Sequence, residues 1–235
     1  MRCGGDWLPG AFAAVAVWGS LGGDALAQEK SRWQLGFNAI AGMPQGEFRD
    51  SIPDTRWGGS GYFTHRFKDT SLRFGLELGI VFNGRVGVVV ESHGRHQRET
   101  EDGYLTNGIY FGRFLTRVQP VYGRWSPYIE GVLGMQVFES SVVVENCIGP
   151  CVIFTPTSSH AVSLGGGGGL SFRIQQGDEE ESGLSVEVAA RYLYGGETEY
   201  YLASDLPDLL GRVPSVPQRS ATSMVTVSFG IVFDF

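Results

Sequence analysis

After its first 27 residues, the sequence contains no long apolar run. A helix that crosses a bilayer needs about 18 or more consecutive, mostly apolar residues, and no downstream segment reaches that length. The chain beyond this point therefore either forms a water-soluble protein or crosses a membrane as strands. Basic residues are also outnumbered: 18 Lys and Arg stand against 25 Asp and Glu, a formal net charge of −7. This acidic balance argues against nucleic acid as a partner.

Cysteine is scarce as well, with three in the whole chain. Cys3 lies near the N-terminus, and the other two, Cys147 and Cys151, stand in the segment N-C-I-G-P-C. Three residues separate this pair, whereas a thioredoxin-type motif has two, and no helix pattern follows. In an exported protein, such an even pair is expected to form a local disulfide.

Motifs for catalysis, cofactors and metals are missing too. Gly165–Gly169 lacks the G-K-[ST] ending of a phosphate-binding loop. His93 and His96 stand in H-G-R-H beside arginines, and a metal site needs three or four converging ligands. The acidic run at 179–181 is interpreted as a solvated turn. We therefore expect no catalytic residue, no cofactor and no metal.

The first 27 residues have the pattern of a cleaved secretory signal peptide. Arg2 precedes the apolar segment Leu8–Leu21, and Ala25-Leu26-Ala27 forms an A-x-A cleavage site. We predict that residues 1–27 are removed and that residues 28–235 form one exported domain.

What the chain does contain is alternation of apolar and small or polar residues. A period of two is typical of a strand with one apolar face. Leu72–Phe82 shows it most clearly, with Arg73, Gly75, Glu77 and Gly79 on the second face. The C-terminal segment Val225–Phe235 repeats it to the last residue.

Eight such segments predict an all-β fold, an eight-stranded antiparallel up-and-down transmembrane β-barrel. Connections of alternating length are typical of such barrels. The expected strands are 32–42, 58–67, 72–82, 104–118, 128–138, 160–175, 184–194 and 225–235. The long connections, predicted as loops, are 43–57, 83–102, 139–159 and 195–221.

Alternation alone does not say which face looks inward, because a soluble barrel would bury the apolar face. In the two ambiguous strands we place Arg66, Arg113 and Arg117 inward. Aromatic residues near strand ends, such as Trp33 and Tyr192, suit the interfaces of a membrane. They favour apolar faces that look outward.

With that orientation, charged residues point into the barrel. An eight-stranded barrel is only wide enough for side chains, and a buried charge without a partner costs several kcal/mol. We predict an Arg–Glu network that plugs the interior; a selectivity filter for ions is the alternative. Its predicted members are Arg73, Glu77, Arg113, Glu130, Arg173, Glu187 and Arg191.

The ending of the chain resembles the C-terminal signal of bacterial outer-membrane β-barrels, which the barrel-assembly machinery reads. The residues that carry this resemblance are Phe229, Ile231, Phe233 and Phe235. Three segments, G-M-P-Q-G-E-F, S-P-Y-I-E-G-V-L-G and L-S-V-E-V-A-A-R-Y, are similar to the small OmpA/OmpX-type outer membrane protein β-barrel domain family. The resemblance spans residues 28–235.

This resemblance implies a location in the cell outer membrane, with lipid and the assembly machinery as partners. Because the sequence ends with the barrel, we expect no peptidoglycan-binding domain. It implies a non-enzymatic barrel whose loops serve structural or adhesion and recognition roles toward an unknown ligand. A small-solute pore is the alternative. Some such barrels modify lipid A with a His and a Ser or Asp; His65 and His160 are candidates, but no motif matches.

Overall fold

The computed structural model describes residues 32–52, 54–67, 70–82, 86–93, 98–120, 124–144, 151–176, 182–200 and 218–235. The predicted signal peptide, residues 1–27, lies outside them.

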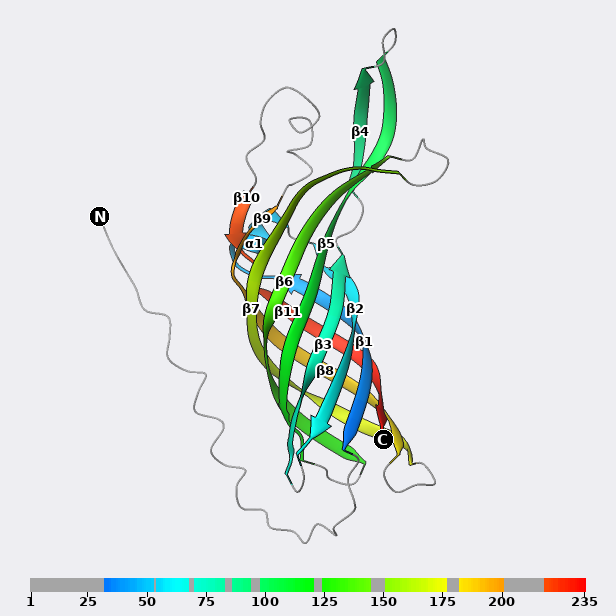
Figure 1. Cartoon of the computed structure of the whole chain (residues 1–235), viewed down its shortest axis with the longest axis vertical. Helices are drawn as coiled ribbons and strands as arrows, with labels where there is room; N and C mark the ends of the chain where they lie inside the picture. The colour runs from blue at the N-terminus through cyan, green and yellow to red at the C-terminus, as the bar shows by residue number, and fades with distance from the viewer. Residues whose placement is uncertain are drawn as a thin grey trace, which may run out of the picture.

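Eight antiparallel strands close into a barrel (Figure 1). The first strand pairs with the last, so that Leu35 lies opposite Phe233 and Ala41 opposite Val227. This pairing leaves the barrel without an open edge. The predicted eight-stranded antiparallel barrel is thus confirmed. In ring order its strands are β1 (Trp33–Pro44), β2 (Arg56–Arg66), β3 (Leu72–Phe82), β5 (Arg98–Val118), β6 (Trp125–Val144), β7 (Cys151–Gln176), β8 (Gly183–Gly195) and β11 (Met224–Asp234).

The two ends of the barrel differ. At the end that we call the turn end, short connections join β2 to β3, β5 to β6 and β7 to β8, and the C-terminus lies there (Figure 1). At the opposite end, called the loop end, lie the additional elements β4, β9, β10 and α1. Alternation of short and longer connections agrees with the sequence prediction.

Two of the predicted loops contain extensions of the barrel strands, which corrects the sequence-based boundaries. Within 83–102, β4 (Val86–His93) pairs with the first residues of β5, and this hairpin stands beyond the barrel (Figure 1). Within 139–159, β6 runs on and β7 begins early. Both segments are rich in valine, and β-branched side chains favour strands.

The other two predicted loops also contain regular structure. Within 195–221, β9 (Glu197–Tyr200) and β10 (Gln218–Ala221) pair as a separate two-stranded sheet. Within 43–57, the short helix α1 (Glu47–Ser51) follows Gly46, whose φ of 58° suits glycine. Among the described residues, no helix is both long and apolar enough to cross a bilayer.

Large apolar side chains cover the outside of the barrel, and charged side chains fill its middle. Leu78 and Phe114 are 68% and 69% exposed, whereas Arg73, Glu77 and Arg117 are 0% exposed. An apolar exterior around a charged interior is the arrangement of a membrane-spanning barrel. A water-soluble barrel would show the reverse.

The phases predicted for the two ambiguous strands are confirmed. Arg66 in β2 is buried, while Phe63 on the same strand is exposed. Arg113 in β5 is buried, while Tyr110 is exposed. In both strands the position of the arginine settles the orientation, because burial of a charge is tolerated only where partners can be supplied.

Candidate functional site: the charged interior

A continuous chain of ion pairs crosses the middle of the barrel. Arg117 pairs with Glu130 and with Glu187, each at 2.8 Å. Arg191 pairs with Glu77 at 2.8 Å and also with Glu130. Glu130 therefore links the two arginines, and the five side chains, each at most 4% exposed, form one network. We call these five residues, with the two hydroxyl donors described next, the ion-pair network.

Two hydroxyl groups complete the network. The Tyr62 hydroxyl donates to Glu187 Oε2 at 3.0 Å and accepts from Arg117 Nη1 at 3.3 Å. The Ser60 hydroxyl donates to Glu77 Oε1 at 2.9 Å.

Each of the three glutamates accepts three hydrogen bonds within the network. Glu130 takes two from Arg117 and one from Arg191. Glu77 takes two from Arg191 and one from Ser60, and Glu187 takes two from Arg117 and one from Tyr62. Burying a charge is tolerated only when such partners replace its water. Each of these carboxylates therefore has hydrogen-bond donors inside the barrel in place of water.

The register of the strands explains how the network forms. Arg117 in β5 lies directly opposite Glu130 in β6, and Arg191 and Glu187 stand on the same face of β8 because an even number of positions separates them. Glu77 reaches Arg191 across the interior, 114 positions away in the sequence. Local alternation points each side chain inward, and barrel closure brings the distant ones together.

Of the predicted interior residues, Glu77, Glu130, Glu187 and Arg191 meet in this network. Arg113 is buried but lies over the Phe111 ring, 3.8 Å from its centroid, and among the described residues it has no carboxylate at ion-pairing distance. It therefore stands beside the network rather than within it.

Arg73 is fully buried toward the turn end, opposite Arg66 and Arg117 in the strand register. Arg173 is only half-buried, beside a register shift in β7. Arg117, which the sequence places inward but not among the network residues, is the central cation. Glu130 lies directly opposite Arg117 on the neighbouring strand, and this pairing could have indicated that Arg117 belongs to the network.

Apolar packing closes the interior on the loop side of the network. Phe48 of α1 is 0% exposed and makes edge-to-face contacts with Phe138 and Tyr200, at 5.9 and 5.7 Å between ring centroids. The Arg56 guanidinium lies over the Phe48 ring at 4.8 Å. Met224 and Ile109 belong to the same buried cluster. We call this cluster, which also contains Ile52, the cap.

The structure describes some of the remaining predicted residues and leaves others undescribed. Phe229, Ile231, Phe233 and Phe235 all lie on the exposed outer face. Cys147 and the side chain of Cys151 lie outside the described residues, so the disulfide stays a prediction. His96 and the side chain of His93 also lie outside them. His65 packs on Trp33 at 4.1 Å, and His160 is exposed. Within the described part of the chain, no three metal-ligating side chains gather.

A closed eight-stranded antiparallel barrel with an apolar exterior and a charged interior has the architecture of the small outer-membrane barrels. No protein-family model matches the sequence, and no curated protein does. Solved structures similar to this chain include three bacterial proteins. Neisserial surface protein A is 15% identical, with 86% of this chain and 97% of that chain covered and a TM-score of 0.39.

The second is Ail, the attachment invasion locus protein of Yersinia pestis. It is 12% identical, with 88% of this chain and 99% of that chain covered and a TM-score of 0.38. The third is a major outer membrane protein from Thermus thermophilus, which is 11% identical. There 86% of this chain and 99% of that chain are covered, and the TM-score is 0.39. Strand pairing within the chain itself defines the fold.

Proposed function

We propose that the protein is a non-enzymatic integral barrel of the cell outer membrane, exported by a cleaved signal peptide. Its interior is closed, and its loop end serves structural or recognition roles at the cell surface. The observation that carries this proposal is the ion-pair network. Arg117 and Arg191 hold Glu77, Glu130 and Glu187 across the interior, and the cap covers them on the loop side.

Conductance across a planar lipid bilayer tests the closed interior. We expect the refolded full-length barrel to show no stable openings at neutral pH, because ions would have to displace both the network and the cap. A matched variant, Arg219→Ala, removes an exposed charge at the loop end and should also show no stable openings. Stable openings of the unmodified protein would contradict the plug and favour a small-solute pore.

Membrane fractionation tests the location. The protein should separate with outer membranes and migrate differently on a gel when it is not heated, because a closed barrel resists detergent until it is boiled. Recovery in the soluble periplasmic fraction would overturn the proposal.

Lipid analysis tests the absence of enzymatic activity. Mass spectrometry of lipid A from cells with and without the protein should give identical spectra. A new acylated or deacylated species would instead indicate a lipid-modifying enzyme, and substitution of His65 or His160 would then locate its site.

A surface role is supported by the hairpin of β4 and β5, which stands beyond the barrel at the loop end (Figure 1). Connecting segments at a barrel mouth often carry recognition on a rigid scaffold. We expect cells that express the protein to bind at least one protein of an immobilised panel of extracellular proteins, and a variant shortened between Val86 and Glu101 to bind it less. The shortened barrel should keep its gel shift, which separates lost recognition from lost folding.

A further inference from the structure

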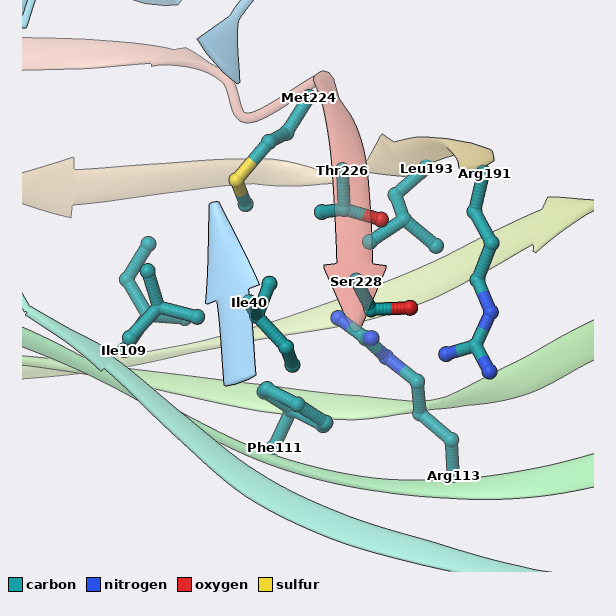
Figure 2. Close-up of a pocket in the computed structure, with 10 residues that line it drawn as sticks. Ile40, Ile109, Phe111, Arg113, Arg191, Leu193, Met224, Thr226 and Ser228 are labelled. Carbon is teal, nitrogen blue, oxygen red and sulfur yellow. The ribbon is translucent and has the colours of Figure 1, made fainter. Parts of the chain in front are cut away.

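The small cavity inside the barrel leaves little room for a ligand. It lies between the ion-pair network, which contributes Arg191, and the cap, which contributes Ile109 and Met224 (Figure 2). Its volume of about 10 Å³ is at the limit for one water molecule. A partner larger than water is therefore expected at the surface rather than in this space.

At the loop end, one strand has an unpaired edge. β4 is the last strand in the order of the nine-stranded sheet, and among the described residues it pairs with β5 alone. The hairpin that these two strands form stands beyond the barrel (Figure 1). The backbone N–H and C=O groups along an unpaired edge are a template on which a further strand can pair.

The sequence of β4 does not protect this edge. Exposed edges are commonly protected by charged side chains, by proline or by a β-bulge. Residues 86–90, V-G-V-V-V, contain no charge and no proline, and β4 pairs with β5 without a register shift. Valine also favours the extended conformation of a strand. A strand of this composition, held clear of the barrel, is suited to pairing with another strand.

The direction of β4 determines which second copy of the chain could pair with it best. The strand runs away from the barrel toward the tip of the hairpin (Figure 1). In two copies within one membrane, the β4 strands point the same way and could pair only as parallel strands. In two copies within facing membranes, they point in opposite directions. Antiparallel pairs are slightly more stable per residue than parallel pairs, so edge pairing favours copies on two different cells.

The segment is also complementary to itself in the antiparallel arrangement. With Val89 of one copy opposite Val89 of the other, Val88 lies opposite Val90 and Glu91 lies opposite Gly87. Valine then faces valine at the centre of the pair, and no like charges lie opposite each other.

We propose that the free edge of β4 pairs antiparallel with β4 of a second copy on a neighbouring cell, and that this contact joins cells that carry the protein. The proposal rests on the proposed function, because it requires the loop end to lie at the cell surface. One contact between two eight-residue edges is weak. Facing membranes hold many copies, however, and linked contacts raise the overall affinity by about 100-fold or more.

Aggregation of mixed cells tests the proposal. Two differently labelled populations of a host strain with short lipopolysaccharide, one with the protein and one without it, are mixed and allowed to settle. We expect aggregates that contain only cells with the protein. Uptake of cells without the protein would overturn pairing between copies, and so would a lack of aggregates. The gel shift of the unheated protein shows whether the barrel is in the membrane, which separates this failure from failure of the proposed function.

Exchange of charge at Val89 tests the pairing itself. Val89→Lys and Val89→Glu each place like charges opposite each other across the two-fold axis, so cells with either variant alone should not aggregate. A mixture of Val89→Lys cells and Val89→Glu cells should aggregate again, because opposite charges then face each other.

The matched control is Gln218→Lys, which adds the same charge at an exposed position of β10, also at the loop end. Cells with this variant should aggregate like cells with the unmodified protein. Aggregation of Val89→Lys cells alone, or a mixture of the two Val89 variants that stays dispersed, would overturn the proposal.

Discussion

The cap and the ion-pair network fill neighbouring parts of one barrel with opposite chemistry. On the loop side, Phe48, Phe138 and Met224 pack as the core of a water-soluble protein would. In the middle, Arg117, Arg191 and their three glutamates form ion pairs in a space where water is excluded. Both arrangements close the interior, but they respond differently to change.

The difference lies in what happens when one member is lost. Apolar neighbours can relax toward a missing side chain, and the cost depends on how far the space collapses. An ion-pair network cannot relax in this way, because each lost carboxylate leaves a buried charge without its partner. The network should therefore tolerate substitution less than the cap, and the following changes test that ranking.

The largest effect is expected for Glu130→Ala. This change removes the one carboxylate that both Arg117 and Arg191 hold, and loss of one partner from a buried ion pair costs about 3–5 kcal/mol. Urea unfolding in lipid vesicles, followed by the gel shift of the unheated protein, measures it. Arg219→Ala is the control. Arg219 and its partner Glu197 are 66% and 61% exposed, and exposed ion pairs contribute about 0–1 kcal/mol to stability. Equal losses in the two variants would refute a network held by burial.

A smaller, local effect is expected for Phe48→Ala. Replacing a fully buried phenylalanine by alanine costs about 3–5 kcal/mol in a well-packed core, but a cap that opens by itself does not report this loss in the unfolding of the whole barrel. Because α1 lies in a connection, the loss should appear as local opening of the loop end. Hydrogen exchange should quicken in α1 and β9 while amides of β3 keep their protection. Uniformly faster exchange over the whole barrel would show that the cap and the network are not separable.

The smallest effect is expected for Gly36→Ala. A methyl group at this position would overlap the ring of Tyr62, whose hydroxyl donates to Glu187. Overpacking of this kind costs about 1–3 kcal/mol. The matched variant is Gly131→Ala, where the nearest atom to an added methyl group is Gly165 O at 3.9 Å. Urea unfolding should separate the two, and equal stability would show that Tyr62 can move without loss.

Much of the barrel could be predicted from local pattern. β3 has the predicted bounds, Leu72–Phe82, because its alternation holds from Leu72 to Ile80 and polar residues flank it. The inward arginines fixed the phase of β2 and β5, since the opposite orientation would place a charge in hydrocarbon. Pairing of the first and last strands follows once eight strands must close.

Other features could not be predicted from the sequence. The helix α1 has five residues, too few for a helical period to show. Ile40, Val81 and Phe111 point inward and form a buried cluster. Alternation alone does not separate such an inward apolar side chain from one that faces the membrane. The central role of Arg117 depends on Glu187, 70 positions away, and only the closed ring brings that pair together.

The wide spacing of the network along the chain bears on how the protein enters a bilayer. Tyr62 stands on β2, Glu77 on β3, Arg117 on β5, Glu130 on β6, and Arg191 on β8. If the hairpins entered hydrocarbon one after another, the charged side chains of the early hairpins would enter before the strands that carry their ion-pair partners. A sheet that closes into a barrel in a hydrated environment, before it contacts lipid, avoids the cost of placing unpaired charges in hydrocarbon.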